Sequence, residues 1–201
     1  MVKIGGLRFS VSDGVFHPGF FFSSKILKSE LLRHPISGKT VLDIGSGSGF
    51  ISVFAAHHEA LVTAIDISRA AVGCTLKNAE INQVQLKVIQ SDLWDQLPPE
   101  TYDYIVINPP YYPQNPEKES QHAWYCGENF EYFNTLFKDI GSYIHQESKV
   151  MMVLSEDCQI EQIKQIANTF DLQFALTATE KNFWEVNYIF EINPEGEKGD
   201  L

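Results

Sequence analysis

Three glycines, Gly45, Gly47 and Gly49, alternate with serines directly after a hydrophobic run that contains Asp43. Such a loop lets the backbone approach a bound ligand closely. Its spacing is GxGxG, not the GxGxxG of dinucleotide sites, and no Lys-Ser/Thr pair follows it as in a phosphate-binding P-loop. Because a nearby carboxylate favours a cationic ligand, the loop indicates S-adenosylmethionine, which carries an ammonium and a sulfonium and no phosphate.

Two more carboxylates follow the next hydrophobic runs, Asp66 after 61–65 and Asp92 after 85–89. Parallel strands end at one edge of a sheet, and open α/β sheets bind their ligands at that edge. Asp66, about twenty residues beyond the glycine loop, is expected to accept both ribose hydroxyls of an adenosyl group. Asp92 is expected to accept the adenine amino group, while Ile67 and Leu93 pack on the faces of the ring.

The hydrophobic run at 102–107 ends in Asn108-Pro109-Pro110-Tyr111, which predicts a site for a planar amine. Proline has no backbone N–H, and Pro109 holds Asn108 extended, so this turn presents hydrogen-bond acceptors. The Asn108 side-chain oxygen and the Pro109 carbonyl can each accept one hydrogen of an NH2 group. Pro110 and Tyr111 are expected to bind the substrate, with the tyrosine ring stacked on its planar group.

This turn would promote methyl transfer to nitrogen, because two fixed acceptors favour the pyramidal nitrogen that forms during attack. Displacement at a sulfonium methyl then depends on orientation more than on a strong base. We therefore predict that Asn108, Pro109 and Tyr111 are catalytic, without a histidine as general base and without a metal. The segment 113–125 is expected to form a lid from which Trp124 contacts the substrate.

Alternating strand and helix patterns predict an α/β fold, a Rossmann-like three-layer sandwich with these residues at one edge of its sheet. The sheet is expected to have seven mostly parallel strands and a C-terminal antiparallel hairpin formed by 172–179 and 184–192. A short N-terminal β-hairpin is expected within 2–16, with its turn at Ser12-Asp13-Gly14. Parallel strands are expected at 39–44, 61–65, 85–89, 102–107 and 149–154, and helices at 23–34, 49–58, 68–81, 128–144 and 159–170.

The chain has 201 residues, 44% of them hydrophobic, which predicts a single domain over 1–192 and a disordered tail over 193–201. Its charge, 15 − 26 = −11, disfavours attraction to nucleic acid or anionic lipid. No apolar run reaches the roughly 20 residues of a membrane span, and no secretory signal opens the chain, so a cytoplasmic protein is expected. Three scattered cysteines fit neither a disulfide framework nor paired zinc ligands.

With these motifs the chain resembles the class I S-adenosylmethionine-dependent methyltransferases that modify planar amines and carry an Asn-Pro-Pro-Tyr motif. It is similar, more narrowly, to the release-factor glutamine methyltransferase family, in segments 7–18, 41–49 and 124–133. That family has Pro-Arg-Pro-Glu-Thr-Glu where this chain has 17–23, and a glycine pair where it has Cys126-Gly127. About forty residues precede the glycine loop, so the N-terminal helical domain of bacterial members is expected to be absent. Short eukaryotic and archaeal relatives also lack that domain and work with a small zinc-binding activator protein.

The resemblance implies S-adenosylmethionine as cofactor and the glutamine amide of a release factor as methyl acceptor. The alternative is N-methylation of an exocyclic base amine in tRNA, rRNA or DNA, with an unpaired or flipped base stacked on Tyr111. The acidic composition favours a protein substrate, because each phosphate contact needs a cationic side chain. Lys or Arg at the mouth of the pocket would favour the nucleic acid. A binding module without catalysis is a third interpretation.

Overall fold

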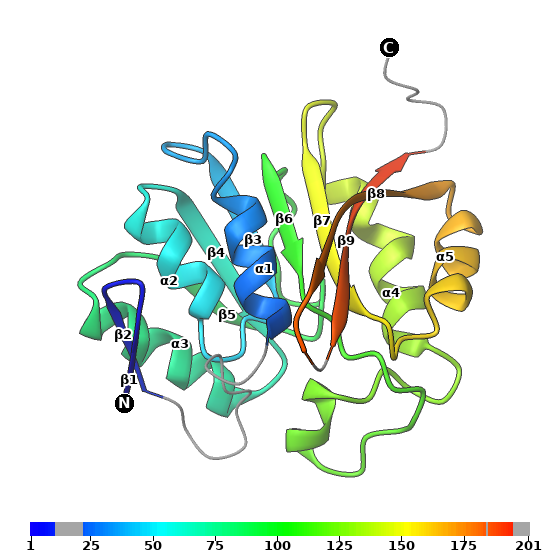
Figure 1. The fold of residues 1–201 in the computed structure, drawn as a ribbon, viewed down its shortest axis with the longest axis horizontal. Helices are drawn as coiled ribbons and strands as arrows, with labels where there is room; N and C mark the ends of the chain where they lie inside the picture. Colours follow the sequence, from blue (N-terminus) through cyan, green and yellow to red (C-terminus); the bar gives the residue numbers. More distant parts are fainter. Residues whose placement is uncertain (11–21, 184, 195–201) are drawn as a thin grey trace.

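The computed structural model describes residues 1–10, 22–183 and 185–194, and its centre is a seven-stranded sheet (Figure 1). The strands lie in the order β5-β4-β3-β6-β7-β9-β8. The first five of these pair in parallel, whereas β9 is antiparallel to both β7 and β8. The predicted sheet with its C-terminal hairpin is confirmed. The strands are β3 (Thr40–Ile44), β4 (Leu61–Asp66), β5 (Lys87–Gln90), β6 (Tyr104–Ile107), β7 (Lys149–Ser155), β8 (Leu172–Lys181) and β9 (Val186–Pro194).

Helices cover both faces of the sheet and complete the three layers (Figure 1). Leu27, Phe50 and Ala79 belong to the core of one face, whereas Phe133 and Ile163 belong to the core of the other. Because both faces are covered, β6 consists only of Tyr, Ile and Val, and each of its residues is buried. The first face carries α1 (Phe22–Leu31), α2 (Phe50–His57) and α3 (Arg69–Ile81), and the second carries α4 (Glu131–Asp139) and α5 (Ile160–Asn168). No helix in the described part of the chain has the length and apolarity needed to span a bilayer.

The strand order reverses between β3 and β6. From β3 the chain passes to β4 and β5 on one side, and then returns past β3 to β6 and β7 on the other. The connections after β3 and β6 therefore diverge, and open sheets bind ligands in the crevice that such a divergence leaves. The glycine loop follows β3 and Asn108 follows β6, so the fold brings both to this crevice.

The predicted N-terminal hairpin is confirmed, and the turn between its two described strands lies earlier in the chain than the predicted turn. β1 (Val2–Ile4) pairs with β2 (Leu7–Phe9), which puts the turn at Gly5-Gly6. Both glycines have positive φ, 53° and 88°, as a two-residue hairpin turn of type I′ requires. The predicted turn residues, Ser12-Asp13-Gly14, lie outside the described residues.

The helix predicted over 128–144 is shorter and has two parts. α4 begins after Phe130, whose backbone is left-handed with φ 59°, and a 3₁₀ turn, η2 (Ile140–Tyr143), follows it. Left-handed backbone is uncommon for residues other than glycine, so a phenylalanine gives no sequence signal for this boundary.

The C-terminal hairpin is longer than predicted. β9 continues to Pro194, so Asn193 and Pro194, predicted as the start of the tail, pair with β8. The remainder of the predicted tail, from 195 onward, lies outside the described residues, as does Trp184.

Candidate active site

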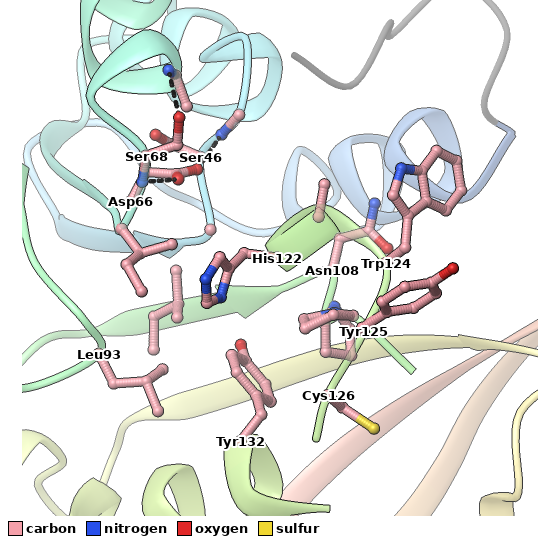
Figure 2. Close-up of a pocket in the computed structure, with 18 of the residues that line it drawn as sticks. Ser46, Asp66, Ser68, Leu93, Asn108, His122, Trp124, Tyr125, Cys126 and Tyr132 are labelled. Atoms are coloured by element: carbon pink, nitrogen blue, oxygen red, sulfur yellow. Dashed lines mark hydrogen bonds between the residues drawn. The ribbon is translucent and has the colours of Figure 1, made fainter. Parts of the chain in front are cut away.

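One cavity of about 440 Å³ lies at the carboxyl edge of the sheet (Figure 2). Four adjacent strands contribute to it: Asp92 follows β5, Asp66 ends β4, the glycine loop follows β3 and Asn108 follows β6. Figure 2 shows Asp66 and Leu93 toward one end of the cavity and Asn108 toward the other. The volume falls in the range of roughly 300–1,000 Å³ that is typical of cofactor sites.

The glycine loop is held against the neighbouring strand by its own amides. Gly45 and Ser46 both donate to the Ile65 carbonyl at 3.0 Å, and Gly47 donates to Asp66 Oδ2 at 2.8 Å. Gly45 and Gly47 line the cavity, as the sequence predicts. The first part of the loop is therefore placed for close approach of a ligand to backbone.

Gly49 has a different position and is not among the lining residues. It precedes α2 with φ 72°, and a Cβ there would lie 2.8 Å from Thr75 Cγ2 and 3.0 Å from Thr75 Cα. The close approach of α2 and α3 thus needs a residue without a side chain. This packing role was not predicted from the sequence, and the contact between Gly49 and the cofactor stays a prediction.

Asp66 is held by two backbone amides at the end of β4. Oδ2 accepts from Gly47, and Oδ1 accepts from the Ser68 amide at 2.9 Å. Burial raises the pKa of Asp66 above its usual value, and these two hydrogen bonds oppose the rise. Each carboxylate oxygen has a second lone pair, so the side chain can still accept hydroxyl groups from the cavity.

Asp43 is buried beneath the loop and also lines the cavity. Its Oδ2 accepts from the Ser52 amide at 3.1 Å and from the Ser52 hydroxyl. Burial raises the pKa of Asp43 to about 6, although the hydrogen bonds from Ser52 lower it. A buried carboxylate of this kind gains most from a cation, because a cation would offset the cost of its charge.

The turn after β5 places Asp92 and Leu93 on the cavity wall, with Ile67 from the turn after β4. Leu93 has φ 47°, and the turn is fixed by the Ser91 hydroxyl, which donates to the Leu93 carbonyl at 2.8 Å. The same hydroxyl accepts from the Gln96 amide at 2.9 Å. One carboxylate and two apolar side chains, as predicted for an adenine site, thus border one cavity.

Asn108 lines the cavity with Pro109, Pro110 and Tyr111. Its amide nitrogen donates to the hydroxyls of two residues in the first turn of α1, at 3.3 Å to Ser23 and 3.0 Å to Ser24. Because the nitrogen is engaged in this way, the side-chain oxygen remains as an acceptor. The two serines were not identified from the sequence, since they fall in an ordinary amphipathic helix pattern.

The segment 113–125 borders the cavity, consistent with the predicted lid, and Trp124 and His122 are among its lining residues. It includes a short 3₁₀ helix, η1 (Glu119–Ala123). Glu119 anchors the segment, because its Oε1 accepts from the Ser68 hydroxyl at 2.8 Å and from the Arg69 amide at 3.0 Å. These contacts join the segment to the start of α3, an anchor that the sequence pattern does not reveal.

The cavity wall is acidic. Among the described residues that line it there is no Lys or Arg, whereas seven carboxylates do so: Asp43, Asp66, Asp92, Asp95, Glu119, Glu131 and Glu185. Such a wall disfavours a phosphate-bearing ligand and fits a cofactor that carries ammonium and sulfonium groups. The described residues contain no cluster of three or more His, Cys, Asp or Glu side chains suited to a metal ion.

Tyr132, on the first turn of α4, is a lining residue that the sequence analysis missed. Its hydroxyl is buried and has no hydrogen-bond partner among the described residues. The residue falls in a helix with a strongly amphipathic pattern, where an aromatic side chain predicts core packing. No signal in the sequence sets it apart.

The sequence pattern of the methyltransferase small domain family matches residues 6–184. Release factor glutamine methyltransferase of Fusobacterium nucleatum is 31% identical over 155 residues, which cover 75% of this chain and 43% of that protein. Human methyltransferase HEMK2 is 32% identical over 143 residues, 66% of this chain and 67% of that protein. The tRNA1(Val) (adenine(37)-N6)-methyltransferase of Pedobacter heparinus is 31% identical over 154 residues, 71% of this chain and 62% of that protein. The chain thus matches less than half the length of the first of these relatives.

Solved structures share the fold. The Mtq2–Trm112 complex of E. cuniculi, described as responsible for methylation of the eRF1 termination factor, superposes with a TM-score of 0.64 at 17% identity, covering 90% of this chain and 99% of that chain. A 16S rRNA N2 G1207 methyltransferase of T. thermophilus, in complex with S-adenosylmethionine and guanosine, gives 0.65 at 20% identity, with 94% and 49% covered. At these identities the likeness concerns the arrangement of strands and helices.

Proposed function

The chain belongs to the methyltransferase small domain family, and on that premise we propose that it transfers a methyl group from S-adenosylmethionine to the nitrogen of a planar NH2 group. The observation that carries this proposal is the acidic cavity at the reversal of the strand order. Asp92, Asp66, the glycine loop and Asn108 follow one another there along adjacent strand ends. Hydrogen-bond acceptors suited to a cationic nucleoside and to an amine thus line the same cavity.

The residues that would hold the cofactor follow from its chemistry. The family and a structural neighbour bound to S-adenosylmethionine support this cofactor. Asp66 would accept the ribose hydroxyls and Asp92 the adenine amine, with Ile67 and Leu93 on the ring faces. Asp43 and the amides of the glycine loop would hold the amino acid end. When bound, the cofactor supplies a methyl group on a positively charged sulfur.

The turn after β6 would hold the methyl acceptor. Ser23 and Ser24 fix the Asn108 amide, so its oxygen and the Pro109 carbonyl can accept the two hydrogens of an NH2 group. Tyr111 would stack on the planar group and direct one face of the nitrogen into the cavity. Because two acceptors stabilise the positive charge that grows on the attacking nitrogen, one proton can leave after the new bond has formed.

The acceptor that we favour is a glutamine side-chain amide in a release factor. Relatives named as glutamine methyltransferases support it, as does the acidic wall, which offers no Lys or Arg to a phosphate backbone among its described residues. The relative that acts on tRNA adenine supports the alternative, an exocyclic base amine. A small activator protein of the Trm112 kind, present in the complex of a structural neighbour, is proposed as a partner.

The test uses S-adenosylmethionine labelled in its methyl group. The purified protein, with and without a Trm112-type protein, is incubated separately with unmodified release factor, bulk tRNA, rRNA and DNA. We expect the label in the release factor and, after digestion, on a glutamine side chain. Label in a nucleic acid would contradict the protein substrate and support the base alternative. Binding of the cofactor with no label in any acceptor would support a binding module without catalysis.

A further inference from the structure

The Tyr132 hydroxyl is buried, and its oxygen is almost fully covered. No side chain or backbone group among the described residues forms a hydrogen bond with it. A buried hydroxyl left unpaired has lost its hydrogen bonds to water without a replacement, so folded proteins rarely keep one. Burial, with smaller contributions from Asp66 and Asp92, raises the pKa of Tyr132, so the phenol stays protonated and can donate.

The ring is held rigidly at the cavity wall. The Tyr132 amide donates to the Cys126 carbonyl at 3.0 Å, and the ring packs edge to face on Phe133, with centroids 5.3 Å apart. Phe133 itself is fully buried. Figure 2 shows the Tyr132 hydroxyl directed from α4 toward His122 and into the cavity. The position of the hydroxyl oxygen is therefore set by this packing, and its hydrogen can turn toward an acceptor.

The position of Tyr132 favours the nucleoside end of the cavity. Besides burial, Asp66, Asp92 and Cys126 raise the pKa of Tyr132. The two carboxylates belong to the ends of β4 and β5, whereas Asn108 follows β6, on the other side of β3. At this end the two carboxylates can accept the ribose hydroxyls and the adenine amine. What they leave unmatched on an adenosyl group are the ring nitrogens, which are acceptors and need a donor.

We propose that the Tyr132 hydroxyl binds the adenosyl group of the cofactor by donating a hydrogen bond to a ring nitrogen of the adenine. This inference rests on the proposed function, because it assumes that the cavity holds S-adenosylmethionine. The hydroxyl would be a hydrogen-bond donor beside the carboxylate acceptors Asp66 and Asp92. It would favour adenine over rings that carry a hydrogen on the nitrogen facing Tyr132.

The test is titration calorimetry with S-adenosylhomocysteine on the wild type and on Tyr132→Phe. We expect the variant to bind about tenfold more weakly, the effect of losing one buried hydrogen bond. The affinity of the wild type should be about tenfold lower for one of the 1-deaza, 3-deaza and 7-deaza analogues of S-adenosylhomocysteine than for S-adenosylhomocysteine itself. The variant should show no further loss on that analogue, since the bond is already absent.

A stability measurement separates this role from a structural one. Tyr132→Phe removes an unpaired buried hydroxyl, so the Tm of the ligand-free variant should be equal to or higher than that of the wild type. Tyr143→Phe is the matched control: its buried hydroxyl donates to the Leu97 carbonyl at 3.4 Å, away from the cavity. That variant should have a lower Tm and unchanged affinity for S-adenosylhomocysteine.

Two results would overturn the inference while leaving the proposed function standing. One is equal affinity of Tyr132→Phe and wild type for S-adenosylhomocysteine. The other is a raised KM for the methyl acceptor with unchanged cofactor affinity, which would place the hydroxyl on the substrate. If the wild type itself failed to bind S-adenosylhomocysteine, the proposed function would fall, and the inference with it.

Discussion

Asn108 is the residue on which the proposed chemistry depends most. Replacing it with Ala removes one of two acceptors for the NH2 group and leaves the cofactor end of the cavity intact. We expect kcat to fall by about 100- to 1,000-fold, as for loss of one fixed polar group at a developing charge. The cofactor Kd, measured by calorimetry, should change little.

Asp66→Ala is the contrasting variant, because Asp66 also orders the glycine loop through the Gly47 amide. This variant should bind the cofactor more weakly but keep its turnover at saturating cofactor. The assigned roles would be wrong if Asn108→Ala weakened the cofactor while Asp66→Ala abolished turnover at saturating cofactor.

Asp43 predicts a pH dependence of cofactor binding. Burial raises the pKa of Asp43 to about 6 in the free protein. A cationic ligand favours the ionised form, so affinity should rise with pH through this value, by up to about tenfold per pH unit below it. Calorimetry from pH 5 to 8 measures the slope.

The effect of Asp43 on protein stability has the opposite pH dependence to its effect on cofactor affinity. The folded-state pKa of Asp43 lies above the unfolded value, so its contribution to the free energy of unfolding is largest at low pH and is lost as pH rises through about 6. Asp43→Asn should flatten the binding profile, and the exposed Asp139→Asn should leave it unchanged. A profile that stays equally steep in Asp43→Asn would assign the titration to another group, such as Asp66, whose pKa burial also raises.

Single site residues can be predicted from the sequence when their place along the chain, directly after a hydrophobic run, sets them apart. Asp66, Asp92 and Asn108 are recognisable because each follows a hydrophobic run, and parallel strands bring their ends together. Ser24 and Tyr132 are not, because each lies in a helix whose amphipathic pattern is explained by packing alone. Their roles depend on which side of the helix faces the cavity, a matter of tertiary structure.

Among the elements, the junction of the glycine loop with α2 gives a sharp test of packing. Gly49→Ala puts a methyl group 2.8 Å from Thr75 Cγ2 in a left-handed residue with φ 72°. We expect the free energy of unfolding to fall by about 2–4 kcal/mol, the sum of backbone strain and overpacking. Urea unfolding followed by circular dichroism measures it.

Gly73→Ala is the matched control for that substitution. Gly73 is an exposed residue within α3, and nothing lies within 4 Å of a Cβ added there. This variant should gain about 0.5–1 kcal/mol from better helix propensity. Equal, small effects of the two substitutions would mean that α2 and α3 are not closely packed at Gly49.

Element types were predictable and boundaries were less so. Each predicted strand of the sheet exists, because buried strands leave apolar runs of distinctive length. The first hairpin shows the limit, since Gly5-Gly6 and Ser12-Asp13-Gly14 are both good turn sequences and only pairing of Val2 with Phe9 distinguishes them. The start of α4 at a left-handed Phe130 is set by its surroundings rather than by its own preference.

For the whole molecule, topology turns separate motifs into one site. The strand order places β5, β4, β3 and β6 side by side, so four segments spread over more than sixty residues of sequence, from Asp43 to Asn108, meet at one cavity. The acidic charge of the chain, −11, is concentrated in part on that wall. The overall fold followed from the alternation of strands and helices, and the sequence also predicted a lid over 113–125, whereas the anchor of that segment at Glu119 required the structure.

The acidic wall of the cavity should select a cationic nucleoside over a phosphate-bearing one. A calorimetric titration of the purified protein with S-adenosylmethionine, repeated in the presence of excess NAD, measures this preference. We predict binding of S-adenosylmethionine at one site per chain, with an affinity that NAD leaves unchanged. Binding of NAD at that site, with no binding of S-adenosylmethionine, would mean that the cavity is a dinucleotide site and that the proposed methyl transfer is wrong.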